Sequence, residues 1–221
     1  PLLRSIAYSE GDLDERRAAH IALASSPNLD LSCRAWHFAA AAAGPDETVA
    51  ALLEQGAEQS QRRGGYLEVA RALQRAGELS PAGGDAARRF TLASVAANFG
   101  GDPAWALSLS SSAVTRSADP EIVGHAALTR ASILVQSARP GQACDLVRST
   151  LDGDRPSDAR LRLALMYVAA SAAYYSGEPA HRVQLRRWLD ETAEDVLGDS
   201  EFPTPLPAES GPLQRAYIAM Y

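Results

Sequence analysis

The 221-residue sequence contains no lysine, and all 21 of its basic residues are arginine. A P-loop needs a lysine at the nucleotide phosphates, and Schiff-base catalysis needs a lysine amine. Both kinds of chemistry are therefore excluded within this segment of chain.

Cysteines and long apolar runs are also scarce. The two cysteines, Cys33 and Cys144, are far apart and lack the spacing of metal ligands, so we interpret them as small buried residues of a protein in the reducing cytoplasm. The longest apolar stretch, 163–175, is too short to cross a bilayer, which predicts no membrane contact. A net charge of −6 without a basic stripe disfavours binding to nucleic acid or anionic lipid.

Few side chains suggest catalysis or metal binding. His20, His37, His125 and His181 are widely separated, and the sequence has no H-E-x-x-H pair. The serine-rich stretch 108–114 lacks the G-x-S-x-G pattern of a nucleophilic serine. We therefore expect no catalytic residue, no cofactor and no metal ligand here, and a protein that is not an enzyme.

Alanine, by contrast, supplies about a fifth of the chain, and strand-favouring residues are few, which predicts an all-α fold. Four related stretches also recur: "GGYLEVA" at 64–70, "GDPAWAL" at 101–107, "ARPGQAC" at 138–144 and "GEPAHRV" at 177–183. Their third residues follow one another at steps of 37, 37 and 39 residues. A period of this size is typical of stacked helical hairpins.

The chemistry of these stretches fits the corner between two helices. Gly64, Gly101 and Gly177 can adopt the positive φ that ends a helix, and a proline suits the first turn of the next one. The spacing predicts first helices of the hairpins at 46–63, 84–99, 120–137 and 157–176, and second helices at 66–80, 103–117, 141–152 and 179–197. Two further helices are expected near 14–25 and 31–43. We predict a right-handed solenoid of antiparallel helical hairpins.

The segment "GGYLEVARALQRAGELSP" (64–81) resembles the second half of a tetratricopeptide repeat, with Ala76 at the small packing position and Pro81 closing the unit. The stretches 1–10, 16–24 and 34–66 resemble the large ATP-binding LuxR-type transcriptional regulators of actinobacteria. That resemblance covers about residues 1–82. It implies a nucleotide-binding domain upstream and a DNA-binding helix-turn-helix downstream, so ATP and DNA binding are expected only outside this segment.

The repeat spacing, the C-terminal prolines and the resemblance together divide the chain. Residues 1–45 would join the ATPase module to the repeats, and 46–198 would form four hairpins. A proline-rich loop would follow at 199–211, and a truncated helix at 212–221. We expect Leu213, Tyr217, Ile218 and Tyr221 to form an apolar patch that drives self-association into a homo-oligomer.

The first helices of stacked hairpins line the concave side of a solenoid. Carrying over the groove positions of the repeat gives nine candidates for binding a protein partner or a small effector: Arg88, Phe99, His125, Ser132, Gln136, Tyr167, Ser171, Tyr174 and Tyr175. The acidic end of this groove would begin at Glu54 and Glu58. A merely solvated concave face, with the tyrosines packed on their neighbours, is the alternative. The functional alternatives are a regulatory module of a LuxR-type factor and a free-standing scaffold that binds proteins.

Overall fold

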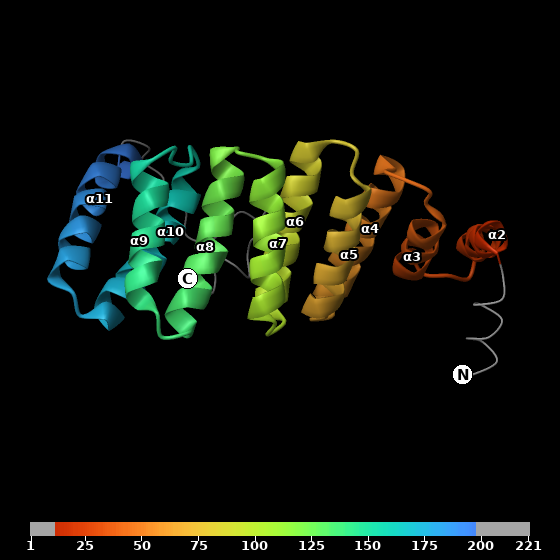
Figure 1. Cartoon of the computed structure of the whole chain (residues 1–221), viewed down its shortest axis with the longest axis horizontal. Coiled ribbons are helices and arrows are strands. Elements are labelled where there is room, and N and C mark those ends of the chain that lie inside the picture. Colours follow the sequence, from red (N-terminus) through yellow and green to blue (C-terminus); the bar gives the residue numbers. More distant parts are fainter. Residues whose placement is uncertain (1–11, 198–221) are drawn as a thin grey trace.

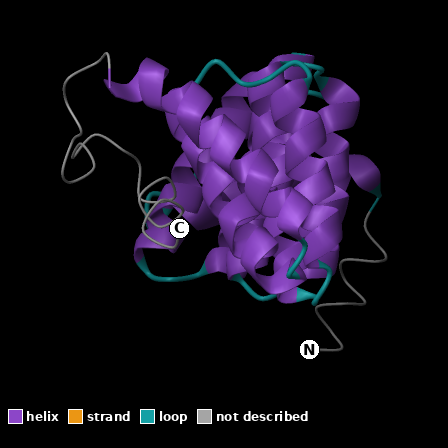
Figure 2. Cartoon of the chain, turned by 90° about the vertical axis from the view of Figure 1, so that its left-hand side faces the viewer, coloured by secondary structure: helices purple, strands orange, loops and turns teal. Residues whose placement is uncertain are grey.

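The computed structural model describes residues 12–197, and within that range the chain forms ten helices and no strand. Two short helices come first, α2 (Leu13–Ala24) and α3 (Leu31–Ala41). Four hairpins follow, each with a leading and a trailing helix: α4 (Glu47–Arg62) with α5 (Tyr66–Leu79), α6 (Gly83–Phe99) with α7 (Pro103–Arg116), α8 (Pro120–Gln136) with α9 (Pro140–Asp152), and α10 (Ala159–Ser176) with α11 (Pro179–Leu197). The helices follow one another along the long axis in Figure 1, and only helices and loops are seen in Figure 2. The all-helical prediction is confirmed.

Local chemistry explains where these helices begin, and the observed ends differ from the predicted ones by at most two residues. A carboxylate at the N-cap accepts a backbone N–H, which satisfies one of the donors that a helix start leaves unpaired. Helices α7, α8 and α9 also have proline in their first turn, where no backbone donor is lost. The capping residues are Asp12, Asp30, Asp46, Asp102, Asp119 and Asp158.

The corners between leading and trailing helices use the predicted glycines. Gly64, Gly101 and Gly177 have φ values of 77°, 83° and 70°, which lie in the left-handed region that glycine adopts freely. The third corner has Ala138 at the equivalent position, with φ of 56°. The same backbone turn is therefore kept at a corner without glycine, although an alanine there costs roughly 1–2 kcal/mol of conformational strain.

The helices form two layers. Each helix packs on the next one in the chain, and the leading helices α6, α8 and α10 also pack on one another in succession. Among the described residues, the trailing helices α7, α9 and α11 make no comparably close contacts with each other. One layer is thus closed and the other is more open, which decides where clefts occur.

Small side chains dominate the core between the layers. Ala70, Ala96 and Ala106 are fully buried in one cluster that joins α5, α6 and α7, and Ala143 and Ala172 are fully buried in another that joins α9 and α10. Alanine allows two helix backbones to approach closely, and it is the best helix former, so one residue type serves both the helices and their packing.

Candidate functional site

The predicted concave groove is only partly on the surface. Ser132 is 3% exposed, and its hydroxyl donates to the Leu128 carbonyl 2.8 Å away. Leu128 itself is fully buried in a cluster with Leu161 and Leu165 of α10. The placement of Ser132 in a binding groove is therefore wrong, because the next leading helix covers this face of α8.

The tyrosines of α10 are exposed. Tyr167, Tyr174 and Tyr175 are 52%, 76% and 69% exposed, and the rings of Tyr174 and Tyr175 meet edge to face at 5.3 Å between centroids. Ser171 is half-buried and donates to the Tyr167 carbonyl. Tyr167 occupies the position on α10 that buried Leu128 occupies on α8. No further leading helix follows α10 within the described residues, so none of them covers Tyr167 as α10 covers Leu128. Its exposure follows from its place at the end of the row.

The remaining groove candidates are spread over two helices. Arg88 and Phe99 lie on α6, where the ring of half-buried Phe99 packs at 5.6 Å from that of Tyr66. His125 and Gln136 lie on α8, one half-buried and the other exposed. These residues and the tyrosines do not converge on one concave site.

The expected acidic end of the groove is an ion-pair network. Both Glu54 oxygens accept from the Arg88 guanidinium, at 2.6 and 2.8 Å, and Arg89 Nε donates to Glu54 at 3.0 Å. Arg89 also makes a bidentate pair with Glu47, at 2.6 and 2.9 Å, and donates to the Ser80 hydroxyl. Glu54 is therefore neutralised and the network joins α4 to α6, whereas Glu58, the other carboxylate of the expected acidic end, is exposed.

The central arginine of this network is almost completely buried. The Arg89 side chain is only 3% exposed, against 23% for Glu54 and 49% for Glu47. The hydrogen bond from Arg89 lowers the pKa of Glu47. Burial alone would raise the pKa of Glu54, but the hydrogen bonds from Arg88 and Arg89 lower it overall. We interpret this network as structural, because its charges are paired within the fold.

A further carboxylate, that of Glu121, connects α8 to the residues directly before α10. It accepts from the Ser157 amide at 2.6 Å, the Ser157 hydroxyl at 2.7 Å and the Asp158 amide at 3.1 Å. Close by, burial lowers the pKa of His125, although the charges of Asp158 and Glu121 oppose that shift. His125 therefore stays neutral around pH 7 and acts as a packing residue between two units.

Two clefts that the sequence interpretation missed lie in the layer of the trailing helices. The α7–α9 cleft has a volume of about 350 Å³, and the α9–α11 cleft about 330 Å³. The first lies over α8 and is lined by Val114, Ala118, Pro120, Val123, Ala126, Ala127, Arg130, Leu146, Ser149, Thr150 and Asp154. The second lies over α10 and is lined by Gly141, Cys144, Asp145, Arg148, Ala169, Glu178, Ala180, His181, Gln184 and Trp188.

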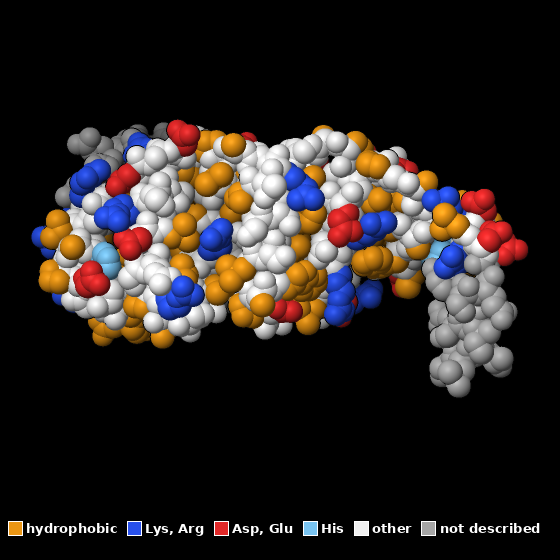
Figure 3. Space-filling view, viewed as in Figure 1, with side chains coloured by type: hydrophobic (Ala, Val, Ile, Leu, Met, Phe, Trp, Pro, Cys, Tyr) orange, Lys and Arg blue, Asp and Glu red, His pale blue; other side chains and the backbone are white. Residues whose placement is uncertain are grey.

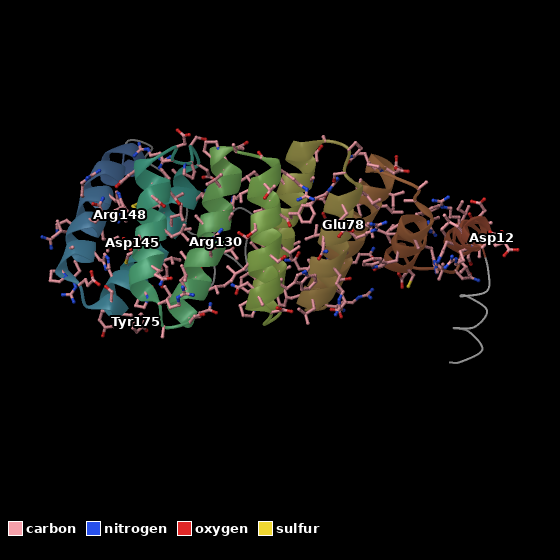
Figure 4. All side chains as sticks on the ribbon, in the orientation of Figure 1. Asp12, Glu78, Arg130, Asp145, Arg148 and Tyr175 are labelled. Atoms are coloured by element: carbon pink, nitrogen blue, oxygen red, sulfur yellow. The ribbon has the colours of Figure 1, made fainter. Side chains whose placement is uncertain are left out.

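The α9–α11 cleft combines a thiol with an imidazole, yet its geometry does not support nucleophilic catalysis. Burial raises the pKa of Cys144 to about 11, so the thiol stays protonated near neutral pH. The His181 Nδ1 atom lies 2.9 Å from the Ser176 hydroxyl, and its Nε2 atom lies 3.7 Å from Glu178. Arg148 pairs with Asp145 at 2.7 Å, and Figure 4 shows these two residues on α9. The polar groups of this cleft are thus mostly engaged with each other.

The N-terminal helices contain one histidine pair. The Nδ1 atoms of His20 on α2 and His37 on α3 lie 2.9 Å apart. The structure does not bury Cys33, which corrects the interpretation of both cysteines as core residues; only Cys144 is buried. Within residues 12–197, no three histidine, cysteine or acidic side chains come together as metal ligands.

Some sequence-based candidates lie outside the described residues. Leu213, Tyr217, Ile218 and Tyr221, which we expect to mediate self-association, all fall in 198–221. A search of the described helices finds none that is long and apolar enough to cross a membrane. No protein-family model, curated protein or solved structure matches this chain.

Proposed function

We propose that this chain is a non-catalytic regulatory module of a LuxR-family, ATP-dependent transcriptional regulator, built as a right-handed solenoid of tetratricopeptide-like hairpins. The observation that carries the proposal is the regular step of the trailing helices. They begin at Tyr66, Pro103, Pro140 and Pro179, steps of 37, 37 and 39 residues, and a residue with left-handed backbone lies two positions before each of them. That regularity supports a repeat solenoid, and the sequence resemblance at 1–82 supports the regulator family.

A binding role is favoured over a catalytic one by the state of the ionisable groups. The most buried arginine, Arg89, is fully engaged with two carboxylates, and the buried thiol of Cys144 is protonated. The open layer of trailing helices instead offers two clefts of the size that small ligands occupy. The module would bind a small effector or a protein partner there and contribute to self-association.

In this proposal the protein is cytoplasmic, and ATP and DNA are bound by domains on either side of the segment. The test is to read the gene on both sides of these codons. A Walker A motif upstream and a helix-turn-helix downstream would support the proposal. A gene that encodes only the helical repeats would favour a free-standing scaffold instead, and would refute the regulator assignment.

The same gene allows a functional test. The complete regulator would be compared with a version lacking residues 46–197, in a reporter strain that carries its target promoter. We expect deletion of the repeats to abolish or to lock the response to the inducing condition, while the ATPase domain still binds nucleotide. An unchanged response would show that the repeats are not regulatory.

A further inference from the structure

The α7–α9 cleft lies at a point where one repeat has a small side chain and its two neighbours have large ones. Position 127 on α8 is alanine, whereas the equivalent positions are Phe90 on α6 and Met166 on α10, both 3% exposed. Ala127 lines the cleft and is itself buried. The two neighbouring repeats thus fill this point with a large apolar side chain, and the third repeat leaves it open.

The preceding repeat shows what the space accommodates. The Phe90 ring lies so close to α5 that an added Cβ on Gly77 would be 3.0 Å from it. The residue equivalent to Gly77 is Val114 on α7, which lines the cleft together with Ala127. In addition, the Arg116 guanidinium lies 4.3 Å above the centre of the Phe90 ring. In the preceding repeat an aromatic ring covered by an arginine therefore fills this point, and in the third repeat the Val114 side chain takes up part of that space.

The third repeat supplies a positive charge of its own. Arg130 replaces Ala93 and Ala169, the alanines buried at the equivalent positions of α6 and α10. It is exposed and forms no ion pair with another described residue, in contrast to Arg88 and Arg89. Figure 4 labels it on α8, and Figure 3 shows scattered apolar and basic side chains over this face of the molecule.

We propose that the α7–α9 cleft binds a small molecule with one aromatic or branched apolar group and one carboxylate. The apolar group would lie over Ala127, in the part of the space that Val114 leaves open, and would contact Val114, Val123 and Leu146. The carboxylate would accept two hydrogen bonds from Arg130, the geometry that a guanidinium favours. The volume of about 350 Å³ lies at the lower end of the range for small-molecule sites, which excludes a large ligand.

The charged side chains that line the cleft favour a ligand with a single negative charge. Asp154 also lines it, so the lining contains one cation and one anion. A phosphate dianion or a nucleotide would meet the repulsion of Asp154 without a second cation to offset it. Ser149 and Thr150 donate their hydroxyls to the Leu146 carbonyl, so they cannot readily donate to a ligand. Arg130 is the group that sets the sign of the charge recognised.

This inference deepens the proposed function and rests on it only for its regulatory meaning. The probe is 4-phenylbutanoate, titrated into the 221-residue chain by calorimetry and by ligand-observed NMR, alongside the neutral 4-phenylbutanol and the cationic 4-phenylbutylamine. We expect saturable binding of the carboxylate at about 1 mM or tighter. The alcohol and the amine should bind at least about tenfold more weakly, because they lose the charge-assisted bond.

Three variants locate the site. Arg130→Gln, at an exposed position, should weaken binding of the carboxylate about tenfold or more. Ala127→Met restores the side chain that the fourth repeat carries as Met166 and should abolish binding. The matched control Arg148→Gln changes an arginine of the α9–α11 cleft and should bind like the unchanged protein. Circular-dichroism melting confirms that each variant folds.

The proposal is overturned if the carboxylate does not bind below about 10 mM, if the alcohol binds equally well, or if Arg130→Gln and Ala127→Met bind as the parent does. These outcomes are separate from those of the proposed function. A Walker motif and a helix-turn-helix in the gene, with no binding of 4-phenylbutanoate, would leave the regulator proposal standing and reject this site. If binding of 4-phenylbutanoate depends on Arg130 and the gene lacks both motifs, this site stands and the regulator proposal is rejected.

Discussion

Arg89 should be the arginine whose loss most destabilises the fold. Replacement by methionine keeps the aliphatic stem but removes the hydrogen bonds to Glu47, Glu54 and Ser80. Breaking one side of a buried ion pair costs about 3–5 kcal/mol when the partner stays buried. Here Glu47 is half-exposed and Glu54 keeps its pair with Arg88, so we expect Arg89→Met to cost about 2–3 kcal/mol, near or below the lower end of that range.

The assay is urea denaturation followed by far-ultraviolet circular dichroism. A lower midpoint at an unchanged slope would report lost stability rather than a changed unfolded state. The matched control is Arg148→Met, which removes a pair with Asp145 in which both side chains are more than half exposed. We expect the control to cost less than about 0.5 kcal/mol. Equal losses in the two variants would refute the reasoning from burial.

The pH dependence gives a second readout of the same network. The pKa values of Glu47 and Glu54 are lowered in the folded state from an ordinary value of 4.5. Each therefore contributes stability that is fully present above about pH 4.5 and is lost as the pH falls through the lowered pKa. The unmodified protein should lose stability below about pH 4.5, and Arg89→Met should show a shallower loss, since the pKa of Glu47 is then closer to its ordinary value. Parallel pH profiles would contradict the assignment of the shift to Arg89.

Three further substitutions test the packing, each by thermal and urea denaturation. Gly124→Ala should destabilise the protein although alanine is the better helix former, because the added Cβ would overlap the ring of Pro156; a stabilised variant would contradict this contact. Ala138→Gly should stabilise it by about 0.5–1 kcal/mol, because glycine relieves the left-handed strain at a small entropic cost. Ala113→Trp should cost on the order of 1–3 kcal/mol or more because Ala113 is fully buried, whereas Ser111→Trp on the exposed side of the same helix should be nearly neutral.

Most of the secondary structure follows from the sequence because its signals are local. A glycine that can take a positive φ and a proline two residues later define a corner without reference to the rest of the chain, as at Gly101 and Pro103. The corner at 138–140 is predicted through its spacing and Pro140, since Ala138 carries no signal of its own. Local chemistry and period together were enough to place every described helix.

The surface of the leading helices was harder to predict because burial depends on neighbours. Thr91, Leu128 and Tyr167 occupy the same position in three successive leading helices, yet the first two are buried and the third is half-exposed. The difference is set by whether another leading helix follows in the described row, which the position within a repeat does not reveal. The same dependence on neighbouring helices explains why Ser132, predicted to line the groove, is buried.

The state of Glu54 was hidden from the sequence by distance along the chain. Its partners Arg88 and Arg89 lie 34 and 35 residues away, about one repeat further on. A charged residue on a leading helix therefore has to be compared with the residues one repeat later before it is counted as a free surface charge. For Arg130, the equivalent position of the next repeat is Ala169, which is buried and uncharged and so offers no partner charge.

The α7–α9 cleft had a sequence signal, although it requires the repeat register to be known first. Val123, Ala127 and Arg130 are separated by four and three residues, so they share one face of α8. The register aligns Ala127 with Phe90 and Arg130 with Ala93. On this face, α8 therefore has a small side chain where α6 has a large one, and a charged side chain where α6 has an alanine. Together these two differences open an apolar space and place there a cation without an ion-pair partner among residues 12–197, so this third repeat differs from its neighbours in the way that a ligand site requires.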